Sequence, residues 1–292
     1  MNSPGPERKR PRYAGGVLYD WTRSGGVGTE CAANAGLPAL VVVDRAQIMT
    51  VISRCYASDL VSRKGCELTV ADARSVANSF TFDGAAPDAV SAAELGKGTY
   101  GLVVSVPYAR QSHPAARAAP GDLNPGSISD TVAMKISYCA DDEDYGLSKS
   151  GLDAGQRLKD CRLVEFNAFS FLAPSTNDVY RGALVVTFMP VLLPVSPRDY
   201  DDDAKIPLLL GLTTFLRELL SCLSKSRAAF TDMKLPNLAM VRGDCGDPSS
   251  AFRLIDLDGM TAFPETSAGV RFGSAATYPL FRKWDYRKHT YA

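Results

Sequence analysis

Histidine is nearly absent from this chain of 292 residues, which contains only His113 and His289. This scarcity excludes a histidine-rich metal centre, and any histidine-based catalytic triad would have to use one of these two residues. The seven cysteines are odd in number, and none of them stands in a C-x-x-C pair. We therefore expect neither a zinc ribbon nor a dense disulfide framework, and we predict reduced, mostly buried thiols.

Long apolar runs and an excess of one charge are also missing. The longest apolar run, Gly182 to Val195, is shorter than the roughly 20 residues of a membrane-spanning helix, and the N-terminus lacks the apolar segment of a secretory signal. Lys plus Arg and Asp plus Glu both number 32, which argues against a nucleic-acid coat protein. We predict a cytoplasmic or nuclear protein without membrane contact. The basic run from Arg8 to Arg12 fits nuclear import, a polyanion contact or a solvated tail.

The first 85 residues divide into two parts. Residues 1–30 are rich in glycine, proline and basic side chains, which predicts a flexible arm. Residues 31–85 predict a folded N-terminal extension of unknown role. Within it, we expect a buried strand at 37–44 and a helix at 46–61, whose apolar residues recur at helical spacing. Core packing or docking against the next domain is the expected role.

A glycine-rich motif, G-x-G-x-x-G-x-V, occupies Gly96 to Val103. Its first six positions also match the Rossmann fingerprint, but a Rossmann turn opens a helix, whereas these glycines run into β-branched residues. No G-K-[ST] follows, so the motif is not a Walker A loop. We predict a strand–turn–strand hairpin whose backbone can lie close to phosphates. Taken alone, a plain glycine turn is the simpler interpretation.

Three further motifs follow in an order that suits phosphoryl transfer. Lys135 lies in a strand-like V-A-M-K and can neutralise phosphate charge. The D-x-K-x-x-N motif contains Asp232, Lys234 and Asn237, which can accept a hydroxyl proton, offset phosphoryl charge and bind magnesium, respectively. Asp256 ends an apolar strand and provides a second hard oxygen ligand for Mg²⁺. Each motif alone fits coincidental polar residues, whereas their common order favours one shared site.

With these four motifs, residues 88–281 resemble a divergent member of the eukaryotic-protein-kinase-like superfamily. The resemblance implies an α+β fold with two lobes: an N-lobe at 86–189 with an antiparallel sheet and a helix, and an abbreviated, helical C-lobe at 190–292. It implies ATP and Mg²⁺ as ligands in the cleft and a protein partner or substrate, with no nucleic acid beyond the basic run. The compact C-lobe is similar to those of viral or small-molecule-directed kinases.

The resemblance also implies a role for each matching residue. Gly96, Gly98 and Gly101 would cover the phosphates, Val103 and Ala133 would roof the adenine, and backbone groups near Thr187 to Met189 would form the hinge at the adenine edge. Lys135 would contact phosphates, Asp232 would be the catalytic base beside Lys234, and Asn237 and Asp256 would be the Mg²⁺ ligands. Glu165, on a helix expected at 161–172, would be the partner of Lys135, with Glu143 as the alternative.

The sequence departs from the family pattern at three places. Phe230-Thr231 replaces the His-Arg before the catalytic aspartate, so phospho-activation through that arginine is not expected. The D-F-G motif is replaced by Asp256-Leu257-Asp258-Gly259, and only 36 residues follow Asp256. We predict an ATP- and Mg²⁺-dependent phosphotransferase, most simply a Ser/Thr protein kinase. A catalytically inactive pseudokinase with a nucleotide-binding or scaffolding role and a small-molecule kinase are the alternatives.

Overall fold

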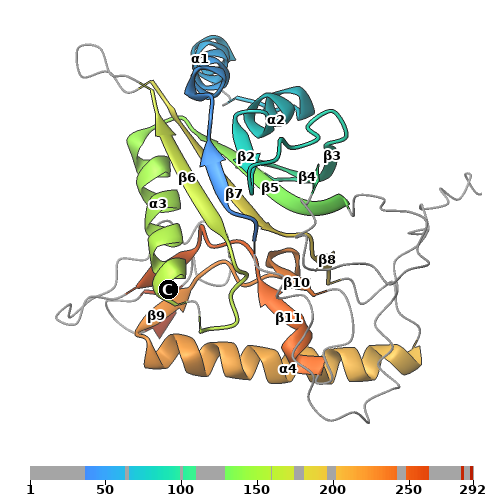
Figure 1. The fold of residues 1–292 in the computed structure, drawn as a ribbon. Helices are drawn as coiled ribbons and strands as arrows, with labels where there is room; N and C mark the ends of the chain where they lie inside the picture. The colour runs from blue at the N-terminus through green and yellow to red at the C-terminus, as the bar shows by residue number, and fades with distance from the viewer. Residues whose placement is uncertain are drawn as a thin grey trace, which may run out of the picture.

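The protein has an upper lobe built on one antiparallel sheet and a lower lobe built along one long helix (Figure 1). The computed structural model describes residues 37–62, 66–98, 101–109, 129–158, 160–173, 181–195, 202–241, 248–262, 284–285 and 290–291. The flexible arm predicted at residues 1–30 lies outside the described residues. The predicted fold class, α+β with two lobes, is confirmed.

The upper lobe contains five antiparallel strands in the order β3-β4-β5-β7-β6. Their bounds are β3 Ala93–Gly98, β4 Gly101–Ala109, β5 Ser129–Cys139, β6 Asn167–Leu172 and β7 Ala183–Pro190. Strand β7 is buried along nearly its whole length. Alternate residues of β7 contribute to two different apolar clusters, because the N-terminal extension covers one face of the sheet and a helix covers the other.

The N-terminal extension packs on the sheet as part of the same core. It consists of β1 (Leu40–Val42), α1 (Arg45–Ser62), α2 (Val70–Ala77) and β2 (Phe80–Phe82), with β1 and β2 antiparallel. The ring of Phe188 meets those of Phe80 and Phe82 edge to face, with centroids 4.9 Å and 5.6 Å away. The helix expected at 46–61 is present. The strand expected at 37–44 is only three residues long, and its Val41 is exposed.

Helix α3 (Asp142–Arg157), which the sequence analysis did not predict, lies alongside the sheet. Asp141 caps it by accepting a 2.8 Å hydrogen bond from the backbone N–H of Asp144, and its first turn is acidic. The helix expected at 161–172 is wrong, because β6 occupies the second half of that segment and pairs with β7. Tertiary pairing therefore decided the structure of a segment whose apolar residues fit either form.

The lower lobe is built around helix α4 (Asp202–Lys225), which runs along its base in Figure 1. Short elements pack above it: β8 Leu193–Pro194, β9 Ala228–Phe230, η3 Leu235–Asn237, β10 Leu238–Met240, η4 Pro248–Ala251, β11 Phe252–Leu254 and β12 Met260–Ala262. Two further short strands, β13 Trp284–Asp285 and β14 Thr290–Tyr291, pair with each other.

Helix α4 is buried on one side only. Leu208, Leu212 and Phe215 face the core at helical spacing, whereas Ile206 and Leu210 are exposed. The stretch from Lys205 to Lys225 is long and apolar enough to cross a membrane by length and composition alone, and the core helices of soluble proteins meet the same criterion.

The segment between α3 and β6 joins the core of the lower lobe. Cys161 forms a disulfide with Cys222 of α4, and the guanidinium of Arg162 pairs with Glu218 at 2.9 Å. A second disulfide joins Cys55 and Cys66 in the extension. The expectation of reduced thiols is therefore wrong for these four cysteines, whereas Cys139 is a buried thiol outside any disulfide, as expected.

Candidate functional site

Lys135 lies in the middle strand of the sheet and reaches two carboxylates of the lower lobe. It stands on β5 between Val103 of β4 and Thr187 of β7. Its Nζ donates to Oδ1 of Asp256 at 2.9 Å and to Oδ2 of Asp258 at 3.0 Å. These contacts span more than 120 residues of sequence. They bring the predicted phosphate-binding lysine next to the predicted magnesium ligand.

Burial and charge pull the pKa values of this cluster in different directions. Burial by itself lowers the pKa of Lys135, but the carboxylates of Asp258 and Asp256 outweigh it and raise that pKa well above its usual range. Burial raises the pKa of Asp256, and the ammonium of Lys135 more than offsets this, so the net shift is downward. The pKa of Asp258 is raised, chiefly by burial and also by the neighbouring charge of Asp256. Lys135 therefore stays protonated beside two carboxylates whose pKa values are shifted in opposite directions.

The structure does not pair Lys135 with Glu165, the predicted partner. Glu165 lies in the loop before β6 and is exposed, and Glu143 is exposed in the first turn of α3. Helix α3 instead lines the pocket around the lysine with Ser148 and Leu152. The prediction failed because it assigned the helix to the wrong segment.

The D-x-K-x-x-N segment folds into a loop in which Asn237 holds Asp232. The amide nitrogen of Asn237 donates to the backbone oxygen of Asp232 at 2.9 Å and to its Oδ2 at 2.8 Å. Nζ of Lys234 also lies 2.7 Å from this Oδ2. The second oxygen, Oδ1 of Asp232, is buried without a hydrogen-bond partner. A buried acceptor without a partner suits a site completed by a bound group.

Backbone contacts join this loop to the Asp256 segment. The backbone N–H of Thr231 donates to the carbonyl of Gly259, and that of Ile255 donates to the carbonyl of Asn237, both at 3.0 Å. A Cβ atom on Gly259 would stand 2.9 Å from the Cβ of Asp232, so this position requires glycine. Backbone hydrogen bonds therefore join the loop of Asp232 to the Asp256 segment, which in turn contacts Lys135.

The glycine-rich motif forms the predicted hairpin. Gly98 on β3 pairs with Gly101 on β4, with two residues between them. A Cβ on Gly96 or Gly98 would meet no atom within 4 Å, whereas one on Gly101 would stand 2.3 Å from the carbonyl oxygen of Ile136. The space beside the first two glycines leaves their backbone accessible, and close packing against β5 requires the third.

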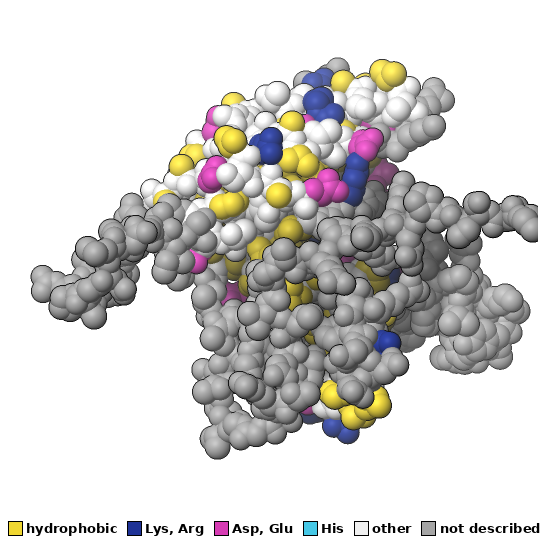
Figure 2. Space-filling view, turned by 90° about the vertical axis from the view of Figure 1, so that its right-hand side faces the viewer, with side chains coloured by type: hydrophobic (Ala, Val, Ile, Leu, Met, Phe, Trp, Pro, Cys, Tyr) yellow, Lys and Arg dark blue, Asp and Glu magenta, His cyan; other side chains and the backbone are white. Residues whose placement is uncertain are grey.

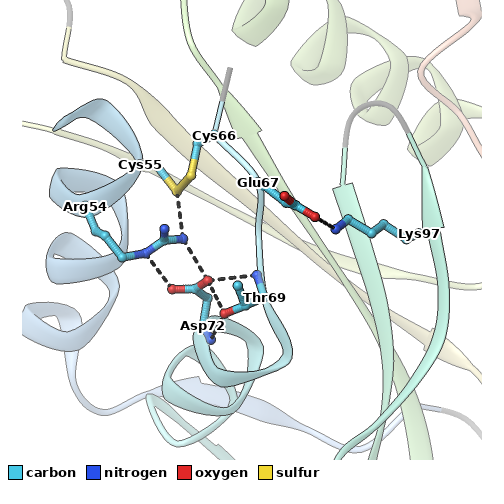
Figure 3. A network of polar contacts seen from close by, with 7 residues as sticks. All are labelled: Arg54, Cys55, Cys66, Glu67, Thr69, Asp72 and Lys97. Atoms are coloured by element: carbon cyan, nitrogen blue, oxygen red, sulfur yellow. Dashed lines mark hydrogen bonds and ion pairs between the residues drawn. A yellow bond between two sulfur atoms is a disulfide. The ribbon is translucent and has the colours of Figure 1, made fainter. Parts of the chain in front are cut away.

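An ion pair between Glu67 and Lys97 joins the N-terminal extension to this hairpin (Figure 3). The segment that carries Glu67 is anchored to α2, where Thr69 and Asp72 form a capping box. Arg54 of α1 donates to both carboxylate oxygens of Asp72, at 2.8 Å and 2.7 Å. The extension therefore contacts the glycine hairpin, while its apolar side chains pack on the face of the sheet opposite Lys135.

Apolar side chains form a cluster beneath the hairpin, at the predicted adenine site. Ala133 and Met189 pack there with Val103, and the cluster also includes residues that the sequence analysis did not select, among them Val164 and Ile255. No pattern in the sequence marks Val164, because it reaches the cluster from an irregular loop.

The residues predicted to form the hinge, Thr187 to Met189, lie inside strand β7. Thr187 is inside β7, and it pairs with Lys135 on one side and with Ala168 on the other. The backbone of Thr187 therefore belongs to the sheet, although its side chain lines the pocket beside Lys135. The chain leaves the sheet after Pro190 and enters the lower lobe through residues 191–195.

The donor set fits a magnesium ion held together with a nucleotide. Within the described ranges, no group of three or more His, Cys, Asp or Glu residues is arranged to hold a metal. Mg²⁺ commonly binds through one or two carboxylates and substrate phosphates. Asp256 provides the carboxylate, and the oxygen of Asn237 remains as an acceptor because its nitrogen is bonded to Asp232.

Comparison with solved structures gives a distant likeness. No family model matches the chain, and no curated protein matches it. A structure search finds similarity to the autoinhibited serine kinase domain of the giant muscle protein titin, with a TM-score of 0.38 and 14% sequence identity. The match covers 59% of this chain and 46% of the titin domain chain, so less than half of that structure is represented.

Proposed function

We propose that this protein is an ATP- and Mg²⁺-dependent phosphotransferase that transfers the terminal phosphate to a hydroxyl, with Ser and Thr side chains of a protein as the leading acceptors. One observation carries the proposal: hydrogen bonds join the segments of three motifs that are far apart in sequence. Lys135 meets Asp256 directly, and backbone hydrogen bonds join the Asp256 segment to the loop of Asp232 and Asn237. Phosphoryl transfer depends mainly on such positioning and charge stabilisation.

Asp232 is the group best placed to accept a proton. Its Oδ2 is held by Asn237 and Lys234, which fixes the orientation of the carboxylate. Its Oδ1 is buried and has no partner, so it can accept a hydrogen bond from an acceptor hydroxyl. The ammonium of Lys234, beside it, offsets negative charge on the transferred group.

The nucleotide would lie between the hairpin and the Asp256 segment. The apolar cluster of Val103, Ala133 and Met189 suits a purine ring, and Lys135 suits the phosphates. Asn237 and Asp256 would hold Mg²⁺, which supplies charge neutralisation at the phosphate oxygens. The surface view in Figure 2 shows positive and negative side chains interspersed on the described part of one face.

One observation favours a pseudokinase as the second candidate. Both carboxylates of the D-L-D-G segment already hold Lys135, so nucleotide binding must compete with two ion pairs. A chain that served only as a scaffold would retain this closed arrangement. Phe230, in place of the usual histidine, is paired into β9 with Met260 of β12 and thus has a structural role in the lower lobe.

Transfer of labelled phosphate from ATP to the protein itself or to a generic acceptor tests the catalytic proposal. Asp232→Asn should abolish incorporation, whereas Asp153→Asn, which removes a carboxylate from an exposed ion pair on α3, should not. A thermal-shift titration with ATP, with and without Mg²⁺, tests binding separately, because a ligand of the folded state raises its stability. Metal-dependent stabilisation with equal label in wild type and Asp232→Asn would identify a pseudokinase. No stabilisation by ATP would overturn the nucleotide site.

A further inference from the structure

We propose that Asp258 is the residue that positions Lys135, in place of a carboxylate on the helix beside the sheet. This inference rests on the proposed function, because it assigns a role within the same site. It differs from the sequence expectation, which gave that role to Glu165 or Glu143. Four observations support it: the contact itself, the surface that α3 presents, the packing of Leu257, and the demands on Asp256.

The contact is specific and shielded. Oδ2 of Asp258 lies 3.0 Å from Nζ of Lys135, and the two side chains are 31% and 17% exposed. An ion pair with this little exposure is screened less by solvent than a surface pair and fixes the direction of the lysine side chain more firmly.

Helix α3 presents no charge to the lysine. Its pocket-lining residues are Ser148 and Leu152. Gly151 and Gly155, on the adjacent part of the helix, press on Leu257: a Cβ at Gly151 would stand 2.2 Å from the backbone oxygen of Leu257, and one at Gly155 would stand 2.4 Å from its Cδ1. The helix therefore approaches too closely for a long acidic side chain at either glycine.

The same packing holds Asp258 in place. Leu257 is buried, its side chain belongs to the core of the lower lobe, and its backbone rests on α3. Because Asp258 is the next residue, the helix sets the position of its carboxylate through this backbone contact. The position of α3 therefore affects Lys135 through the loop of Leu257 and Asp258 rather than through a side chain of the helix.

Two carboxylates on one lysine allow a division of roles. If Asp256 turns to a metal, Lys135 loses one of its two partners in a largely buried position, which would be costly without a second one. Asp258 supplies that second partner. Asp256 is then available to the metal while Lys135 stays directed at the phosphates.

The first test needs no nucleotide. A limiting amount of an amine-acylating reagent is applied at fixed pH, and modification of Lys135 is compared with that of the exposed Lys149 by mass spectrometry. Asp258→Asn should raise the modification of Lys135 several-fold relative to Lys149, and Asp258→Glu should restore much of the protection. Glu165→Gln and Glu143→Gln should leave it unchanged. Equal modification of Lys135 in wild type and Asp258→Asn, with both variants folded, would overturn the proposal.

The second test uses phosphate transfer by the wild-type protein and the same variants. Asp258→Asn should lower kcat about tenfold to a hundredfold with a smaller change in the KM for ATP, because displacement of a positioning group acts mainly on the reacting geometry. Asp258→Glu should recover part of the loss. A loss in Glu165→Gln equal to that in Asp258→Asn would contradict the assignment. If wild type transfers no phosphate, the proposed function fails, while the acylation result still decides the role of Asp258.

Discussion

Gly151 of helix α3 rests on the backbone of Leu257, so closely that a Cβ atom on the glycine would stand 2.2 Å from the Leu257 carbonyl oxygen. Leu257 lies between the two aspartates that hold Lys135. The helix and the charged cluster are therefore in direct steric contact. Any displacement of α3 toward this loop must also move the carboxylates.

Substitutions at two glycines of α3 separate this contact from helix propensity. Gly146→Ala should raise the free energy of unfolding by up to about 1 kcal/mol, because alanine favours the helix and a Cβ there meets nothing within 4 Å. Gly151→Ala should instead lower it by about 1–3 kcal/mol through overpacking. It should also weaken the Mg²⁺-dependent thermal shift with ATP. Urea unfolding of both variants measures the first effect, and equal stabilisation by the two alanines would show that the contact is unimportant.

The disulfide between Cys161 and Cys222 should contribute more stability than the one between Cys55 and Cys66. The two bonds span 61 and 11 residues, and the longer loop restricts the unfolded chain more strongly. Replacement of each pair by alanine should show a difference in unfolding free energy of about 1.5 kcal/mol. Denaturant unfolding without reductant provides the measurement. If thiol titration of the unreduced, denatured chain finds all seven cysteines free, neither bond is present.

Cys139 should make the stability depend on pH in the alkaline range. Burial raises the pKa of its thiol from 9.0 to about 11, although a hydrogen bond with Ser148 opposes the shift. Between these two pH values the folded state binds the proton and the unfolded state loses it, so the free energy of unfolding falls as pH rises. Below pH 9 the stabilisation is fully present.

Urea unfolding at pH 8, 9.5 and 10.5 tests this dependence. Cys139→Ala should remove part of the slope, by an amount on the order of 2 kcal/mol across the window. Burial raises the pKa of Tyr138 to about 12, so ionisation of Tyr138 also lowers the free energy of unfolding at higher pH. This contribution remains in Cys139→Ala. Identical slopes for wild type and Cys139→Ala would contradict the prediction. Alkylation of Cys139 at pH 8 should require denaturation.

A side chain at Gly182 should be destabilising because of its backbone conformation and because of a steric clash. Comparison with Gly84 separates these two effects. The φ of Gly182 is +99°, and a Cβ would stand 2.6 Å from the ring of Tyr138. Gly84 has a similar φ of +82° but no atom within 4 Å of the added Cβ. Gly84→Ala should therefore cost about 1–2 kcal/mol for the backbone conformation alone, and Gly182→Ala should cost more. Thermal unfolding of both variants measures these losses of stability. Equal losses in Gly84→Ala and Gly182→Ala would contradict the prediction.

Much of the candidate site was predictable because its chemistry is local. The D-x-K-x-x-N spacing places Asp232, Lys234 and Asn237 in one short loop, so their contacts follow from neighbouring residues. The glycine hairpin was also predictable, because β-branched residues follow the glycines directly. The helix beside the sheet was not, since α3 contains three glycines and an acidic first turn, which resemble a loop when packing is unknown.

The sequence alone determined the order and chemical identity of the charged groups: a strand lysine, an aspartate held by an asparagine, and an aspartate at the end of an apolar strand. Only the tertiary structure decided that Lys135 pairs with Asp258 and that Glu165 stays exposed. These partners are brought together across more than 120 residues by the packing of α3 on Leu257. Local periodicity contains no information about that distance, because side-chain partners in a core are selected by shape and separation in space.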